Sequence, residues 1–591
     1  MNQETKICKN CHSSFTITPD DFGFYEKIKI LPPTWCPACR NQRRLSWRNE
    51  RSLHKRKCDA PGHTEEMISM YAPGVGRVYD YKFWWGDEWD AMEYGRDYDF
   101  SKPFFAQFKE LLSQVPVPSL SVVNSVNSDY SNWTEYNKNC YLVFAAGLND
   151  NVRYANKSLE GKDTQDVLYI GHVELGFELV NCFNSYRLFY GLNCKSCTDS
   201  AFLYECRDCT NCFGCTNLVG KSYCMWNDQL SKDEYKRRMA EIDFASYAVV
   251  QKLKKDFAER LLTIFHRASR IVGSTNCTGN DINNSKNCRS CFDIFEDLED
   301  SKYSITAMKS KELYDSMGQW KMNFSCENVD NNVGTNVACS ITTYTSHDAR
   351  YCMSCHSSSN LFGCVGLRSK EYCILNKQYT KEDYEALKEK IIASMGDEYG
   401  SFFPIELSPF CYNETIAQEY FTLTKAEALS KGYRWMEPEI KHYQITKQTG
   451  DLPNHIKDVD EKILSEVIGC QHAGTCNEQC TTAFKIIPQE LQFYQRMSLP
   501  LPRLCPNCRH YQRLAQRNPL KLWHRSCMCG NRVTQNAQRV ASDQTLQATR
   551  YTNSATHFHG DQPCPNEFET TYAPDRKEIV YCEQCYQQEV S

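Results

Sequence analysis

Short β-prone runs recur at regular intervals of thirteen to fifteen positions through the middle of the chain. One such run per interval, with Asn, Asp and Cys at the corners, is typical of a parallel β-helix whose coils bury their inner faces against each other. We therefore predict a solenoid with one coil per interval. Cysteines mark the intervals. Cys182, Cys197 and Cys212 are fifteen positions apart, and Cys326, Cys339 and Cys352 are thirteen apart.

The middle of the chain also carries helix signals. Ser231 and Thr380 are each followed three residues later by an acidic residue, an arrangement typical of a helix N-cap. We expect a basic helix over 233–270 that caps the first solenoid half, and a short amphipathic helix over 104–112. Because segment 211–235 is similar in sequence to segment 360–384, we predict two solenoid halves.

The two ends of the chain are similar to each other. Each has a pair of cysteines, an apolar run with Phe-Tyr, and a Cys-Pro-x-Cys-Arg motif that opens a helix. Two pairs of thiolates around a hairpin-length insert provide the four ligands that Zn²⁺ prefers, so each end predicts a treble clef. One extra residue separates the first pair of the second copy. The predicted ligands are Cys8, Cys11, Cys36, Cys39, Cys476, Cys480, Cys505 and Cys508.

Composition narrows the class of protein. The chain has 591 residues, 34 of them cysteine, with 68 Lys+Arg against 73 Asp+Glu. The N-terminus lacks an apolar signal region, and no apolar run approaches the roughly 20 residues of a membrane helix. We therefore expect a soluble cytoplasmic protein, whose cysteines are metal ligands, buried small residues or reactive thiols and not disulfides.

A further zinc site is predicted near the C-terminus. Five cysteines compete for four positions there, and His557 and His559 lie nearby in sequence. With the paired sites this makes two or three structural Zn²⁺ ions. The predicted ligands are Cys527, Cys529, Cys582 and Cys585, with Cys564 as the alternative.

The central run Cys206-x-x-Cys209-x-x-Cys212-x-x-Cys215 has the spacing of a metal site. In the second solenoid half, however, Ser358 stands opposite Cys209, and a leucine that cannot bind metal stands opposite Cys212. We favour a ladder of buried thiols over a metal site, because cysteine behaves as a small apolar residue when it is buried.

The helices that follow the terminal cysteine motifs are strongly basic. Residues 40–57 hold eight Lys/Arg and one Glu, and 509–525 hold five Lys/Arg and no acid, although Pro519 interrupts the second stretch. Cations at helical spacing beside an aromatic residue suit nucleic acid, while a solvated or partner-binding face is the alternative. The predicted contacts are Arg40, Arg43, Arg44, Trp47, Arg48, Arg51, Arg509, Arg513, Arg517, Lys521 and Arg525.

The predicted fold class is a mixed, β-rich multidomain protein in which two treble-clef zinc domains flank a duplicated short-coil parallel β-helix with helical caps. The expected units are a treble clef with an aromatic extension, β-helix half 1, a helical cap, β-helix half 2, a helical and irregular linker, and a second treble clef with the C-terminal zinc site. Their ranges are 1–100, 101–232, 233–272, 273–380, 381–470 and 471–591.

These motifs resemble those of the zinc-ribbon (treble-clef) domain. The whole chain also resembles large cysteine-rich zinc-ribbon proteins of candidate-phyla bacteria in the order of its motifs. These are, in sequence, the Cys-Pro-x-Cys-Arg motif, Trp84-Trp85, the cysteine-rich repeats, the stretch 412–415 and the final Cys582-x-x-Cys585. The resemblance covers nearly the whole chain. It implies zinc binding and no particular activity.

Motifs of enzyme chemistry are scarce. The sequence contains no Gly-rich phosphate loop, HExxH or GxSxG motif, and His172 with Glu174 and Glu178 is a weak acid/base candidate. We therefore expect a non-enzymatic zinc-binding protein that contacts nucleic acid, with structured RNA as the favoured partner. The alternative is a protein-interaction scaffold that uses the β-helix surface, with purely structural zinc.

Overall fold

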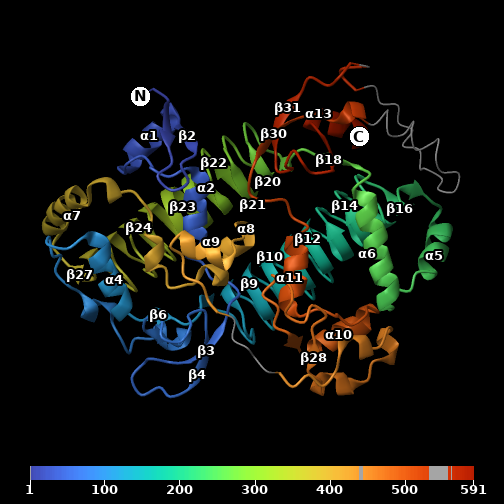
Figure 1. The fold of residues 1–591 in the computed structure, drawn as a ribbon, viewed down its shortest axis with the longest axis horizontal. Helices are drawn as coiled ribbons and strands as arrows, with labels where there is room; N and C mark the ends of the chain where they lie inside the picture. The colour runs from blue at the N-terminus through green and yellow to red at the C-terminus, as the bar shows by residue number, and fades with distance from the viewer. Residues whose placement is uncertain (1, 438–442, 532–556, 561, 591) are drawn as a thin grey trace.

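Two parallel β-solenoids form the centre of the molecule (Figure 1). The computed structural model describes residues 2–437, 443–531, 557–560 and 562–590. The β-rich solenoid prediction is confirmed. The first sheet contains β7 (Val122–Val123), β8 (Asn132–Glu135), β9 (Tyr141–Gly147), β10 (Arg153–Leu159), β11 (Gln165–Gly171), β12 (Phe177–Phe183), β13 (Tyr186–Leu192), β14 (Thr198–Tyr204), β15 (Thr210–Phe213), β16 (Ser222–Met225) and β17 (Asp228–Gln229).

The second solenoid has the same parallel pairing, and in each sheet only the last strand runs antiparallel to its neighbour. Its long strand β23 continues through successive coils without a break. The strands are β19 (Ile271–Val272), β20 (Gly279–Asn283), β21 (Cys291–Ile294), β22 (Glu296–Glu299), β23 (Ile305–Ala338), β24 (Tyr344–Arg350), β25 (Ser359–Phe362), β26 (Glu371–Ile374) and β27 (Lys377–Gln378).

The regular coils of the first solenoid follow one another at twelve positions along the sequence. Arg153 pairs with Tyr141 on one side and with Gln165 on the other, the same shift each time. Residues with positive φ recur at every third position, so a coil has four corners and four three-residue sides. The predicted interval of thirteen to fifteen positions is longer than these regular coils, and its spacing of fifteen corresponds to one coil plus one side. A spacing of thirteen does occur at one coil of the second solenoid, where Phe292 pairs with Ile305.

The central cysteines occupy inward positions of these coils. Cys206, Cys209, Cys212 and Cys215 each follow a residue with positive φ, and all four are fully buried. Each thiol donates to the carbonyl oxygen two residues earlier, at 3.2–3.6 Å. Among the described residues, no cysteine of either solenoid belongs to a group of three or more possible metal ligands. The Cys-x-x-Cys spacing here follows from the three-residue sides.

Helices close the two solenoids where the sequence places capping residues. The Ser231 hydroxyl accepts from the Glu234 N–H, and the Thr380 hydroxyl accepts from the Asp383 N–H, each at 3.2 Å. The single helix expected over 233–270 is instead two helices, because Ser246 caps a second one and accepts from the Val249 N–H. The helices are α5 (Lys232–Ala240), α6 (Tyr247–Leu261) and α7 (Lys381–Met395).

The N-terminal cysteine-rich region lies against the second solenoid (Figure 1). Its helix α2 rests on β23, and the segment after it leads through short elements to the first solenoid. The helix expected over 104–112 is confirmed. The elements are β1 (Glu4–Ile7), β2 (Ser14–Ile17), α1 (Pro19–Ile28), α2 (Pro37–Leu45), β3 (His54–Lys57), β4 (Glu66–Ser69), β5 (Val78–Tyr79), α3 (Tyr81–Trp84), η1 (Ala91–Tyr94), α4 (Phe104–Gln114) and β6 (Val117–Pro118).

The C-terminal part of the chain packs against the first solenoid, with α11 over β11 and β12 (Figure 1). Its strand β32 pairs in parallel with β18, which follows α6. Strand β18 comprises Phe265–Arg267, between the two solenoids. The elements that follow α7 are η2 (Gly396–Glu398), η3 (Ile405–Leu407), η4 (Tyr412–Glu414), α8 (Ile416–Tyr420), α9 (Lys425–Ser430), η5 (Thr449–Asp451), η6 (Ile456–Asp458), η7 (Glu461–Ser465), β28 (Ile468–Gly469), β29 (Ala483–Phe484), α10 (Pro488–Met497), α11 (Pro506–Leu514), β30 (Trp523–Ser526), η8 (Cys529–Asn531), β31 (Glu567–Thr570), β32 (Ile579–Tyr581) and α13 (Glu583–Val590). The first of them, up to residue 410, pack with the second solenoid.

The two solenoids also touch each other directly. Lys157 Nζ lies 3.0 Å from Asp293 Oδ2, and Arg270 lies 3.3 Å from Glu205. Lys157 and Asp293 are both buried, so this ion pair sits inside the molecule and not at its rim. The two solenoids are therefore joined by a buried contact.

Candidate functional site

The first candidate metal centre is the predicted one. The Sγ atoms of Cys8, Cys11, Cys36 and Cys39 all lie within 4.8 Å of one another. Cys36 is the N-cap of α2 and Cys39 lies in its first turn, so the positive end of the helix dipole faces the thiolates. A hydrogen bond from Cys39 holds the pKa of Cys36 well below its usual range. This group can hold a metal ion.

The distances suit a tetrahedral ion. Four thiolates that are each about 2.3 Å from one ion lie about 3.8 Å apart. The Sγ atoms of Cys11 and Cys36 are 3.7 Å apart. Two further groups contain S–S distances of 3.9 Å, between Cys470 and Cys508 and between Cys564 and Cys582. The donor sets therefore fit a thiolate-bound metal.

The second group of thiols differs from the predicted one in one member. Its four thiols are Cys470, Cys480, Cys505 and Cys508, with Cys470 where we expected Cys476. Cys476 falls instead in another group of possible ligands, with His472, Glu478 and Cys508. The Cys505 N–H donates to Cys470 Sγ at 3.3 Å, as the Cys36 N–H donates to Cys8 Sγ at 3.2 Å in the first centre.

The misplaced ligand has a physical explanation. Cys470 directly follows strand β28, as Cys8 directly follows β1. The knuckle of this centre is simply longer, and Cys476 lies within it, with its Sγ 3.7 Å from that of Cys508. The sequence signal for Cys470 is the strand-like Val-Ile-Gly that precedes it, and not a second cysteine close by.

Substituting Cys470 and Cys476 separately tests this assignment. We expect Cys470→Ser to lose one equivalent of metal per chain, because serine replaces a thiolate of the four-thiol group. We expect Cys476→Ser to keep the native metal content, which makes it a matched control in the same knuckle. Elemental analysis of the purified full chain gives both values. Loss of metal from Cys476→Ser alone would reverse the assignment.

The third centre uses the alternative ligand. Cys527, Cys564, Cys582 and Cys585 form the four-thiol group, so Cys564 replaces Cys529. Cys582 directly follows β32 and Cys585 lies in α13, where its Sγ is 3.7 Å from that of Cys564. Cys529 lies instead beside His559, with Sγ and Nε2 3.3 Å apart.

The arginines of α2 lie inside the molecule, on carboxylates of β23. Arg40 contacts Asp315 at 2.8 Å, and Arg44 contacts Glu327 at 2.8 Å. Arg40 is 2% exposed and Arg44 is fully buried. Arg43 reaches Glu327 at 3.0 Å, Arg48 reaches Asp330 at 2.8 Å, and Trp47 is buried against Phe402 and Phe403.

Helix α11 repeats this arrangement on the first solenoid. Arg509 and Arg513 share Asp166, at 2.5 and 2.8 Å, and both are buried. Arg509 also contacts Glu490 at 3.3 Å. Arg517, just beyond the helix, reaches Asp293 of the second solenoid at 3.1 Å. The arginines of α2 and α11 therefore form internal contacts between the terminal cysteine-rich regions and the solenoids.

The carboxylates that receive these arginines occupy solenoid corners. Asp166, Asp293, Asp315, Glu327 and Asp330 all have φ between 51° and 56°. Aspartate is one of the few non-glycine residues enriched in this conformation. Corners of adjacent coils are stacked at the strand spacing of about 4.8 Å, and residues four apart on a helix rise about 6 Å, so a row of arginines can match a row of corners.

Three further predicted contacts lie nearer the surface. Arg51 stacks on the ring of Phe144 and donates to Asn507 at 3.2 Å. Lys521 is exposed, beside Trp523, and Arg525 is half-buried and donates to the carbonyl of Ala573. The predicted row of cations is therefore not one continuous exposed surface, because most of its arginines are buried in ion pairs with carboxylates. Nucleic-acid binding stays a prediction.

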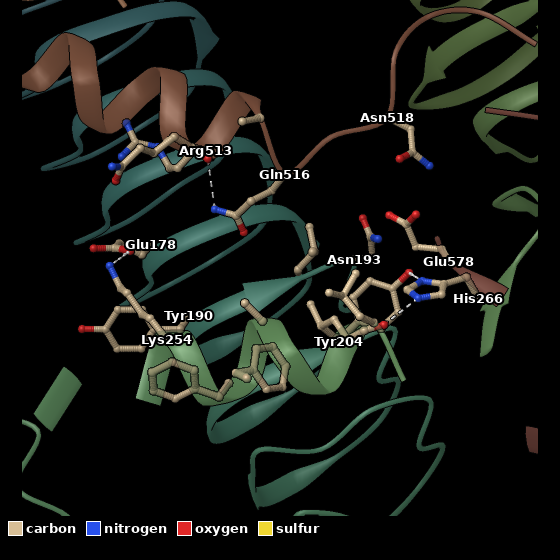
Figure 2. A pocket seen from close by; sticks show the side chains of 18 of the residues that line it. Glu178, Tyr190, Asn193, Tyr204, Lys254, His266, Arg513, Gln516, Asn518 and Glu578 are labelled. Atoms are coloured by element: carbon tan, nitrogen blue, oxygen red, sulfur yellow. Dashed lines mark hydrogen bonds and ion pairs between the residues drawn. The ribbon is translucent and has the colours of Figure 1, made fainter. Parts of the chain in front are cut away.

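A pocket of about 420 Å³ lies between α6, α11 and the first solenoid (Figure 2). Phe202 and Phe257 line it from the solenoid and from α6, and Gln512 and Gln516 line it from α11 and the residues after it. The C-terminal region contributes Tyr572 and its neighbours. Its volume lies within the range of small-ligand sites, and four separate segments build it.

The charged groups of this pocket are paired. Figure 2 shows the ion pair between Lys254 and Glu178 at one end, and Glu578 beside His266 at the other. Glu578 pairs with Arg576. Among the charged residues that line the pocket, the sequence pointed to Glu178, Arg509 and Arg513 but not to a common cavity, because the pocket arises from segments hundreds of residues apart.

The other weak acid/base candidates are on the exposed solenoid face. His172 Nδ1 lies 2.9 Å from Glu160, and Glu174 lies 3.3 Å from Lys162. The four side chains are between 42% and 57% exposed. Pairs of this kind are typical of a solvated surface and do not by themselves form a catalytic group.

His266 at the end of the pocket is neutral at physiological pH. Burial lowers its pKa to about 4, and the nearby cations Arg576 and Arg270 act in the same direction. Its Nε2–H donates to the carbonyl of Leu261, and its Nδ1 accepts from the Tyr204 hydroxyl, both at 2.8 Å. The ring therefore ties β18 to the solenoid without carrying charge.

We expect His266 to make the protein sensitive to acid. Above a pH of about 6.5 both the folded and the unfolded state hold a neutral ring. Between about 6.5 and about 4 only the unfolded state takes up the proton, so the free energy of unfolding falls by up to about 3 kcal/mol as the pH falls. Urea unfolding at several pH values measures this slope. An identical slope in His266→Gln would contradict the assignment.

The fold and these groups define a β-solenoid protein with cysteine-rich centres that can bind metal. None of the helices that the structure describes is both long and apolar enough to cross a membrane.

The chain matches no protein-family model and no curated protein. A solved structure described as a "putative acetyltransferase" from Desulfovibrio desulfuricans G20 is similar to 45% of this chain and 69% of its own, at 10% identity and a TM-score of 0.11.

Proposed function

We propose that this protein is a non-enzymatic, zinc-dependent scaffold that binds other proteins. The metal is proposed to be Zn²⁺ because each group supplies four thiolates and leaves no coordination position free, as in structural zinc sites. Both ends have the same order of elements: a pair of strands, a helix, and a second helix that begins at a cysteine. This shared order supports a treble clef of the zinc-ribbon kind that is duplicated, with one copy at each end.

The observation that carries the proposal is the burial of the arginines. Helices α2 and α11 begin at metal ligands, and their arginines end on corner carboxylates of the two solenoids. An exposed functional surface would leave such side chains in water, whereas these are less than a tenth exposed. The metal centres therefore have a structural role: they position helices that hold the solenoids.

The pocket supplies a site for a partner. Aromatic side chains such as Phe202 and Phe257 can take an apolar anchor residue, and the amides of Gln512 and Gln516 can bond to an extended backbone. Its carboxylates Glu178 and Glu578 are held by cations, which favours recognition over acid/base catalysis. We propose a short peptide segment with a large apolar residue as the ligand.

Peptide display on the full chain tests this proposal. We expect selected peptides to share an aromatic or aliphatic anchor and to bind Ala258→Trp at least ten-fold more weakly, because Ala258 lines the pocket. Ala248→Trp is the matched control, since Ala248 is exposed on the same helix and does not line the pocket. Equal affinity for both variants, or no enriched peptide, would contradict the proposal.

The nucleic-acid proposal remains as a second candidate with a distinct signature. Its support is the exposed Lys521 and the half-buried Arg51 and Arg525, near the surface of the second metal domain. Binding of structured RNA through such cations must weaken steeply as salt rises. Retention of RNA by the full chain, with a steep salt dependence that Lys521→Ala reduces, would favour it over the scaffold.

A further inference from the structure

We propose that a second metal ion binds at the C-terminus, to Cys529, His557, His559 and Cys585. One donor atom of each residue lies within 4.8 Å of the other three. Cys585 also belongs to the third centre, with Cys527, Cys564 and Cys582. The result is a two-metal cluster in which Cys585 bridges a four-sulfur site and a site with two sulfurs and two nitrogens.

The distances agree with a tetrahedral ion at this position. Cys529 Sγ and His559 Nε2 are 3.3 Å apart, Cys585 Sγ and His559 Nε2 are 3.6 Å apart, and the two Sγ atoms are 3.6 Å apart. Metal bonds of about 2.3 Å to sulfur and about 2.0 Å to nitrogen place tetrahedral ligands about 3.3 to 3.8 Å apart. The separations among Cys529, His559 and Cys585 are therefore compatible with binding to one ion.

The far side of each histidine ring is already engaged. His557 Nε2 lies 3.2 Å from a carboxylate oxygen of Glu589, and His559 Nδ1 lies 2.6 Å from the carbonyl oxygen of Gln562. A proton on each of those nitrogens leaves the other nitrogen, His557 Nδ1 or His559 Nε2, as an acceptor. Metal-binding histidines are oriented in this way by a carboxylate or a backbone carbonyl.

The shared cysteine resolves the count of ligands. The sequence alone offers five thiols for four positions and two histidines without a role. A thiolate sulfur has lone pairs enough to bind two ions, so Cys585 can serve both sites and Cys529 becomes a ligand. Five thiolates around two divalent ions carry one net negative charge, against two for four thiolates around one ion, so the second ion also reduces the charge to be stabilised.

A similar set in the second metal domain lacks this support. His472, Cys476, Glu478 and Cys508 are also close together and share the last cysteine of a four-thiol group. There, His472 Nδ1 and Glu478 Oε2 lie 3.0 Å apart, and among the described residues neither atom has a hydrogen-bond partner. No contact on the far side of the His472 ring orients it in the described part of the chain, as Glu589 and Gln562 orient the C-terminal histidines. The argument therefore applies to the C-terminal cluster.

Metal analysis of full-length variants tests the proposal. We expect His559→Ala and Cys529→Ser each to lose one equivalent of metal, and Cys585→Ser to lose two. His524→Ala is the control, because His524 lies on β30 of the same region, is exposed, and is paired with Glu567 and Glu569. Native metal content in both His559→Ala and Cys529→Ser would overturn the proposal.

A measurement on the native chain avoids the question of whether variants fold. The chain is loaded with cadmium-113 and studied by NMR. Besides the signals of the first and second centres, we expect two cadmium signals from the C-terminal cluster. One comes from a four-sulfur and one from a mixed sulfur and nitrogen environment, and the two are coupled to each other through the Cys585 sulfur. If every cadmium signal is uncoupled from the others, the bridged cluster does not exist.

Discussion

Removal of the metal ions with a strong chelator is expected to unfold the terminal cysteine-rich regions and to release α2 and α11 from the solenoids. Each structural site of this kind contributes about 10 to 16 kcal/mol of metal-linked folding free energy. Both helices begin at two ligands, Cys36 and Cys39 in one and Cys505 and Cys508 in the other. Without the ion these cysteines lose the bonds that hold them together, and the helix start loses its anchor.

Thermal unfolding before and after chelation measures this effect. We expect a large fall in the midpoint that restored metal reverses. Cys36→Ser should behave like partial metal loss, whereas Cys411→Ser should melt like the native chain, since Cys411 is a half-buried cysteine outside the groups of possible ligands found among the described residues. A metal-free chain that melts at the native temperature would contradict a structural role for the metal.

Replacement of Asp166 by alanine is expected to cost about 3 to 5 kcal/mol. The carboxylate is buried, and both Arg509 and Arg513 depend on it. Removing one partner of a buried ion pair leaves an uncompensated charge in the interior, which costs far more than the pair itself contributes. In this case two guanidinium groups lose their partner at once, although Arg509 keeps Glu490.

A surface pair provides the comparison for Asp166→Ala. Asp199 pairs with Arg187 at 3.2 Å on the exposed face of the same solenoid, where both side chains are more than a third exposed. We expect Asp199→Ala to change the free energy of unfolding by less than about 1 kcal/mol. Urea titrations give both values. If the two variants lose equal stability, the arginines of α11 do not depend on Asp166 as described.

Much of the fold was predictable from sequence, because its signals are local. Ser231 and Thr380 cap helices as expected, and the recurring short apolar runs predicted a solenoid. The coil length was missed because cysteines mark several positions around a coil, so their spacing mixes coils with sides. Only the backbone shows that corners with positive φ recur at every third residue, even at Leu142 and Ala145.

The groups of cysteines that could bind metal were predictable where the cysteines are closely paired in sequence. Cys470 was not identified, because the loop between it and Cys480 is longer. The direction in which the arginines point was not predictable. A basic helix has the same composition whether it faces phosphate or a carboxylate 275 residues away, as Arg40 and Asp315 do. The negative charge of the rest of the chain was the available signal, and part of it forms the corner carboxylates that receive these helices.

Hydrogen exchange followed by mass spectrometry, on the metal-loaded and the metal-free full chain, tests the central claim most directly. That claim is that metal centres hold arginine-bearing helices on the solenoids. The prediction is that metal removal makes α2 and α11 exchange rapidly, while strands β10 to β13 stay protected. Unchanged protection of α2 and α11 in the metal-free chain would contradict it.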